Sequence, residues 1–168
     1  MSTNVSVNTY TYSVTYVTQQ MMRSIKLILM MSGLSLENLR DGWASVELAI
    51  NTWLASGDLE KVTIEIYKPA SGALVTRWDF EIDYSYSTAD DGALWADPEA
   101  ISAAIRKAGA VASTCEYEFK LLAPGGPKVP GWGPVPYRST VGFNQHSVGT
   151  TISGSPIAAT TTFWSKTS

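Results

Sequence analysis

Residues 60–86 encode the centre of the fold, EKVTIEIYKPASGALVTRWDFEIDYSY. Apolar and polar side chains alternate over residues 62–66 and again over residues 74–84. Between the two runs, residues 68–72 (KPASG) are rich in turn-forming residues. This pattern predicts a hairpin of two antiparallel strands, with one face packed on a core and the other exposed to water.

Three helices and a further strand are predicted around this hairpin. Apolar residues recur at helical spacing over residues 14–31, over residues 36–56 and over residues 98–108, the last of which follows Asp97 as a helix cap. Residues 114–122 alternate like a strand. The order of elements predicts an α+β fold, with a small, mainly antiparallel sheet backed by three helices.

The C-terminal quarter of the chain has a different composition. Residues 124–136 read PGGPKVPGWGPVP, and all fifteen acidic side chains of the protein precede them. The segment still contains several aromatic and β-branched residues, so we expect it to pack on the core, with a strand around residues 139–152. Two interpretations stay open: two additional edge strands with a loop, or a long segment that can occupy more than one position.

Length and composition restrict the class of protein. The chain has 168 residues, which fits one domain, and a formal net charge of −3, which argues against nucleic-acid binding through bulk charge but leaves a local basic patch open. A single cysteine, Cys115, excludes an intramolecular disulfide framework and fits a reducing compartment. No apolar stretch is long enough to span a membrane, and residues 1–13 do not resemble a secretory signal. We therefore expect a soluble, cytoplasmic protein without a membrane partner.

No group of residues in the sequence specifies catalysis. His146 has no acidic residue within twenty positions, and Cys115 falls on the apolar face of its predicted strand. Asp90 and Asp91 lie in an acidic loop at residues 87–96 that lacks the spaced oxygen ligands of a calcium loop. The sequence thus predicts a protein that is not an enzyme and has no cofactor or metal. The alternatives are a small hydrolytic or metal-dependent enzyme that uses this loop, and a β-rich structural assembly subunit.

Seven short runs point to a known family. They are YSVTYVT (12–18), GDLEKV (57–62), IEIYKP (64–69), LVTRWD (74–79), IRKAG (105–109), GW (131–132) and YRST (137–140). Together with the order of the elements, they resemble a bacterial HORMA-domain protein of the kind associated with CD-NTases in CBASS anti-phage systems. The resemblance covers nearly the whole chain.

The resemblance implies a single HORMA-like domain over residues 1–168, with a mobile N-terminal arm at 1–12, a core at 13–123 and a C-terminal safety belt at 124–168. It also implies a signalling adaptor. The belt would wrap a closure-motif peptide of a partner protein, which lies as an extra strand between the sheet and the 98–108 helix. The closed form would bind and activate a CD-NTase, and a AAA+ remodeller of the Trip type would grip the arm and reopen the domain. Nucleic acid is implied as an indirect partner at most.

The resemblance also suggests which residues do this. The expected peptide cleft combines apolar side chains of three segments: Ile101, Ala104, Ile105 and Ala108 from the third helix, Tyr117, Phe119 and Leu121 from the following strand, and Phe143 and Val148 from the belt. The expected handle for the remodeller consists of Val5, Val7, Tyr10 and Tyr12.

Overall fold

A computed structural model describes residues 2–85 and 94–166, with side chains from residue 10 onward. Its helices are α1 (Ser2–Met31), α2 (Glu37–Ser56) and α3 (Pro98–Ala108). Its strands are β1 (Lys61–Tyr67), β2 (Leu74–Asp83), β3 (Trp95–Ala96), β4 (Glu116–Leu122), β5 (Phe143–Ser153) and β6 (Ala158–Lys166). The acidic loop predicted at residues 87–96 lies mostly outside the described residues.

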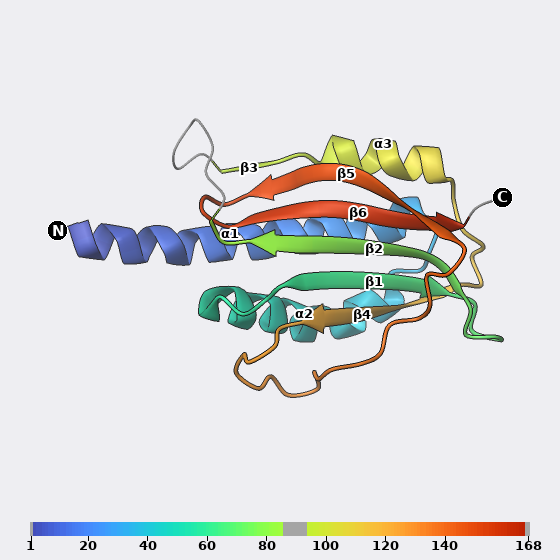
Figure 1. The fold of residues 1–168 in the computed structure, drawn as a ribbon, viewed down its shortest axis with the longest axis horizontal. Coiled ribbons are helices and arrows are strands. Elements are labelled where there is room, and N and C mark those ends of the chain that lie inside the picture. Colours follow the sequence, from blue (N-terminus) through green and yellow to red (C-terminus); the bar gives the residue numbers. More distant parts are fainter. Residues whose placement is uncertain (1, 86–93, 167–168) are drawn as a thin grey trace.

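The six strands form one antiparallel sheet in the order β3-β5-β6-β2-β1-β4. The helices lie on one face of it: α1 runs behind the middle strands, α2 lies near β1 and β4, and α3 lies beside β5 (Figure 1). The α+β prediction, with a small antiparallel sheet backed by three helices, is therefore confirmed. Strand β4 forms one edge of the sheet, and α3 lies near the opposite edge.

The first helix begins at Ser2, twelve residues before the predicted start at residue 14, so it includes the described part of the segment expected to be a mobile arm. Residues 2–31 contain no proline or glycine, the residues that end or weaken a helix. The Tyr10 hydroxyl donates a hydrogen bond to the Leu54 carbonyl at 2.8 Å and so attaches this part of α1 to the end of α2. The first turns of α1 project past the ends of the strands (Figure 1).

The central hairpin forms as predicted, but only part of its second face is exposed to water, as at Glu81 and Asp83. Strands β1 and β2 pair antiparallel, with Ile64 opposite Trp78 on the core side. On the other side, which we call the outer face, Thr63, Glu65 and Asp79 are nonetheless buried. A remote part of the chain covers them, as described below, and the alternation within the hairpin cannot reveal such a cover.

Helix α3 has the predicted boundaries. The Asp97 carboxylate accepts a hydrogen bond from the Ala100 N–H at 3.1 Å, and Pro98 occupies the first turn, where its missing N–H has no intrahelical partner to lose. Ile101 and Ile105 are buried, and α3 contacts α1 and β5. Local sequence therefore determines the boundaries of α3, and the buried apolar side chains of α3 hold the helix against the rest of the domain.

The C-terminal segment divides into two parts. Residues 143–153 and 158–166 form β5 and β6, and β6 pairs with β2 in the interior of the sheet. Trp78 stacks on Phe163 with ring centroids 4.9 Å apart, which joins these late strands to the core. Part of the expected belt at 124–168 is thus sheet, namely β5 and β6. The long segment before them, residues 123–142, lies outside the strands, and we call it the strap.

Candidate functional site

The strap starts at the end of β4, runs along the outside of that edge and reaches the start of β5 across the ends of the other strands (Figure 1). Its first half is attached to α2. The Trp53 Nε1–H donates to the Pro127 carbonyl at 2.7 Å, and the Trp132 Nε1–H donates to the Ser45 hydroxyl at 3.0 Å. Val129 is buried among the core residues. This half of the strap therefore has a defined position against the helix layer.

Gly126 permits this close approach. A Cβ atom added to Gly126 would lie 2.8 Å from Trp53 Cδ1 and 3.1 Å from the Cβ of Asp58. Because Trp53 is itself buried and bonded to Pro127, it has little room to move away. A side chain at position 126 would thus push the strap off α2.

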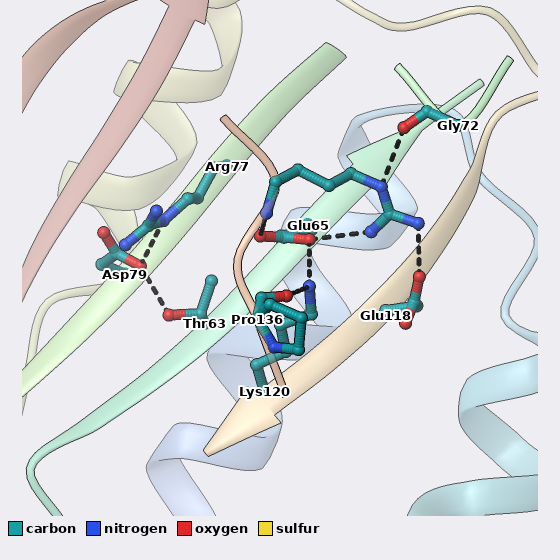
Figure 2. Close-up of polar contacts among 9 residues, drawn as sticks. Thr63, Glu65, Gly72, Arg77, Asp79, Glu118, Lys120 and Pro136 are labelled. Carbon is teal, nitrogen blue, oxygen red and sulfur yellow. Dashed lines mark hydrogen bonds and ion pairs between the residues drawn. The ribbon is translucent and has the colours of Figure 1, made fainter. Parts of the chain in front are cut away.

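The second half of the strap is attached to the outer face through Arg138. Its guanidinium donates to Glu65 Oε1 at 2.7 Å, to Glu118 Oε1 at 2.5 Å and to the Gly72 carbonyl at 2.9 Å, and its backbone N–H donates to Glu65 Oε2 at 2.9 Å (Figure 2). Three chain segments, β1, β4 and the β1–β2 turn, thus meet at one strap residue.

Lys120 completes this arrangement from β4. Its ammonium group donates to Glu65 Oε1 at 2.6 Å and to the Pro136 carbonyl of the strap at 2.7 Å (Figure 2). The Glu65 side chain is 0% exposed and that of Lys120 is 6% exposed. Buried charges of this kind are tolerated only where each one is paired and hydrogen-bonded. We call Glu65, Lys120 and Arg138 the buried ion cluster.

A second polar group lies beside this cluster on the outer face. Asp79 accepts hydrogen bonds from the Thr63 hydroxyl at 2.7 Å, from Arg77 Nε at 3.0 Å and from Trp164 Nε1 at 3.1 Å. The ring of Tyr137, a strap residue, lies 4.6 Å from the guanidinium carbon of Arg77. The strap therefore covers a continuous polar layer, whose residues would meet water if it moved away.

The electrostatics follow from this burial. Burial raises the pKa of Glu65, but the hydrogen bonds from Lys120 and from the backbone and guanidinium of Arg138 outweigh it, so the pKa lies below its ordinary value. Partial burial lowers the pKa of Arg138, but hydrogen bonds to Glu118 and Glu65 raise it overall. Both groups are held in their charged forms.

This lowered pKa predicts how stability depends on pH. The contribution of ionised Glu65 is complete above its unfolded-state pKa of about 4.3 and is lost as the pH falls through the lower folded-state value. We therefore expect that the wild-type chain exceeds Glu65→Gln in unfolding free energy by a constant amount at neutral pH. This advantage should shrink as the pH falls below about 4.3. Urea denaturation at each pH measures it, and an advantage that is constant with pH would contradict the prediction.

Strand β4 pairs with β1 on one side, and no other strand of the described residues pairs with its second side. Where β4 ends, a cavity of about 350 Å³ opens between the strap, Trp53 and the side chains of Leu121 and Leu122. The site thus combines a strand edge with free hydrogen-bonding capacity, an adjacent cavity and a strap attached at both ends.

The structure separates the residues expected to form one cleft. Residues of α3 lie near the β5 edge of the sheet, whereas those of β4 lie at the opposite edge, because the β5–β6 hairpin adds to β2 on the α3 side. Ala104 and Val148 do line one groove between α3 and β5. Ala108 lines a different cavity at the end of α3. Ile101 and Ile105 are core residues.

The β4 residues of the expected cleft face the helix layer. Tyr117 is buried, where its hydroxyl accepts a hydrogen bond from the Leu39 N–H at 3.0 Å and donates one to the Ser35 carbonyl at 2.7 Å. Phe119 contacts the Tyr117 ring edge to face. Only Leu121 borders the cavity beside the strap. Phe143 begins β5 opposite Lys166, remote from these three.

The expected handle is only partly described. Tyr12 is 64% exposed, whereas Tyr10 is half-buried against α2. The side chains of Val5 and Val7 lie outside the described residues, although their backbone belongs to α1.

Sequence reasoning missed Trp53 and Trp132 as wall residues of the cavity and the buried ion cluster as the attachment of the strap. The available signal was weak: Arg138 is the only arginine after residue 123. Glu65 and Lys120 occupy alternating positions that, read locally, indicate a solvent face.

The enzymatic alternative depended on His146, Asp90 and Asp91. His146 contacts the Ser165 hydroxyl at 2.9 Å and stacks on Phe163, as expected for a hydrogen-bonded surface histidine. Asp90 and Asp91 lie outside the described residues. Within residues 2–85 and 94–166, no three His, Cys, Asp or Glu side chains are grouped closely enough to ligate a metal ion. In the same part of the chain, no helix has the length and hydropathy that crossing a bilayer requires.

The antiparallel sheet, the helices on one face of it and the strap around its edge strand are together the features of one class of protein, the HORMA proteins. The chain belongs to the HORMA proteins: the model of the family Bacterial HORMA domain 2 matches residues 2–167. A search of the curated proteins found no match.

Solved structures agree with this assignment and confirm the HORMA fold. A chain in the crystal structure of the mitotic checkpoint complex aligns with a TM-score of 0.70 and 13% identity, covering 93% of this chain and 99% of that one. HTP-2 from C. elegans, bound to the HIM-3 closure motif, aligns with a TM-score of 0.51 and 14% identity, covering 80% and 72%. HTP-2 bound to HTP-3 closure motif 1 has the same TM-score and identity, with 80% and 69% covered.

Proposed function

We propose that this protein is a peptide-binding conformational adaptor that holds an extended peptide along the free edge of β4, beneath the strap. The observation that carries the proposal is the combination of an edge strand with a strap attached on both sides of it, to α2 through Trp53 and Trp132 and to the outer face through Arg138. This site differs from the cleft expected between α3 and β4, whose two walls lie at opposite edges of the sheet.

The physical basis is strand addition. A peptide that pairs with β4 gains main-chain hydrogen bonds, which supply affinity, while side-chain cavities supply selectivity. A strap that closes over the peptide slows its escape, so the complex is expected to be long-lived. The HTP-2 structures support this proposal, since each contains a bound closure motif.

We further propose the setting implied by the family resemblance. The peptide would come from a partner protein, the peptide-bound form would bind and activate a CD-NTase in cytoplasmic anti-phage signalling, and a AAA+ remodeller would reopen the domain. Membership of the bacterial HORMA family supports this setting. The projecting first turns of α1 would be the part that the remodeller grips (Figure 1).

A displayed peptide library tests the binding function directly. The full-length chain is used to select from random 12-residue peptides, and the selected peptide is then added during hydrogen–deuterium exchange. We expect enrichment of peptides that bind this chain and not an unrelated protein of similar charge. We also expect slower exchange in residues 116–122 and in the strap, because their amides gain partners and cover.

Two results would contradict the proposal. One is a library that yields no specific peptide. The other is protection confined to the groove between α3 and β5, where Ala104 and Val148 lie, with β4 unchanged. The second result would restore part of the sequence-based site.

A further inference from the structure

The cavity at the end of β4 is mostly apolar. Its principal lining residues are Trp53, Leu121, Leu122, Pro127, Val129 and Trp132. Among the lining residues in the part of the chain that the structure describes, Lys128 is the only charged one. A volume of about 350 Å³ is sufficient for a large side chain.

The two tryptophans give this cavity fixed walls. The only polar atom of each ring, Nε1, is already bonded, in Trp53 to the Pro127 carbonyl and in Trp132 to the Ser45 hydroxyl. What these rings offer a ligand is therefore apolar carbon. Gly126 keeps the strap against Trp53, so the wall formed by that ring cannot easily shift.

The cavity also lies where an added strand would pass. Leu121 and Leu122 are the last two residues of β4, and Leu122 is 38% exposed. A peptide paired with the β4 edge would project side chains toward the cavity at this end, because side chains alternate between the two faces of a strand. The anchor residues of an interface lie in desolvated pockets, and this apolar cavity beside the strand edge offers such a pocket to a ligand side chain.

We infer that this site selects extended peptides carrying one large apolar anchor residue, such as Trp, Phe, Leu or Met, which enters the cavity between Trp53, Trp132 and Leu122. This inference rests on the proposed function and adds the chemical class of the ligand. The anchor replaces water in the cavity, whereas an acidic residue would have only Lys128 as a partner.

The displayed random 12-residue library tests this inference with a matched pair of variants. Leu122→Glu places a charge at the cavity, and Leu48→Glu makes the same change at a leucine of α2 that is 57% exposed and does not line the cavity. We expect the wild-type selection to converge on one large apolar position. The selected peptide should bind Leu122→Glu about tenfold more weakly and Leu48→Glu with unchanged affinity. Circular dichroism of both variants checks that the fold is intact.

The outcomes separate the inference from the proposed function. Two results would overturn the inferred apolar anchor and leave the peptide-binding function standing. In one, the selected peptides bind along β4 without a shared apolar position, and in the other they share an acidic position that depends on Lys128. Equal affinity of wild type and Leu122→Glu likewise overturns the anchor. A library that yields no specific peptide for the wild-type chain overturns both. If Leu122→Glu fails to fold, nuclear magnetic resonance of the wild-type chain replaces the comparison. The indole N–H resonances of Trp53 and Trp132 must then shift when N-acetyl-leucinamide is added and not when N-acetyl-glutamate amide is added.

Discussion

Glu65→Ala is expected to lower the free energy of unfolding by about 3–5 kcal/mol, the cost of breaking a buried ion pair by removing one partner. The substitution leaves Lys120, whose side chain is 6% exposed, without its carboxylate. It also removes one of the three acceptors of the Arg138 guanidinium and the acceptor of the Arg138 backbone N–H. Lys120 cannot easily reach water, because the strap covers it through Pro136.

Urea denaturation measures this effect, and Glu99→Ala is the matched control. Glu99 is paired with Arg106 on the surface of α3, where the two side chains are 76% and 59% exposed. Exposed ion pairs contribute about 0–1 kcal/mol, so this control should change stability little. If Glu65→Ala cost no more than the control, the buried ion cluster would not stabilise the folded state.

Arg138→Ala is expected to shorten the lifetime of a bound peptide about 100-fold. The variant removes three side-chain hydrogen bonds of the strap, to Glu65, Glu118 and Gly72, each made by a charged donor. A hydrogen bond to a charged group is worth about 1.5–3 kcal/mol, so loss of this set is enough to release one end of the strap. Glu65 keeps Lys120 as its partner, so the domain itself should remain folded.

Surface plasmon resonance with the peptide selected from the library measures the dissociation rate. Arg106→Ala is the control, because it removes an arginine from an arginine–glutamate pair far from the strap. Hydrogen exchange should also quicken in the strap of Arg138→Ala and not in that of Arg106→Ala. Equal dissociation rates for the two variants would mean that the attachment at Arg138 does not retain the peptide.

Elements with strong local signals could be predicted from the sequence. The boundaries of α3 followed from Asp97 and Pro98, and the β1–β2 hairpin followed from its alternation and turn. Both depend on residues close together in the chain, where capping, turn formation and periodicity act. The start of α1 was missed, because residues 2–12 are rich in Thr, Asn and Val, which favour helix only weakly.

The candidate site was predicted less well, because its parts are far apart in sequence. The family resemblance indicated a C-terminal segment that wraps the domain. It did not reveal that β6 pairs with β2 inside the sheet, nor that β4 and α3 lie at opposite edges of the sheet. Strand order depends on which edge the late hairpin joins, and no local pattern in β5 or β6 encodes that choice.

Local patterns in the sequence specify most of the core helices and strands, and the short runs shared with the family indicate a HORMA-like α+β domain. Which polar residues are buried depends instead on how distant segments pack together. Glu65 looks like a surface residue within its own strand, and it becomes an interior anion because Arg138, seventy-three positions later, folds back over it. Its environment is set by a contact between distant segments, and alternation along a single strand carries no information about such contacts.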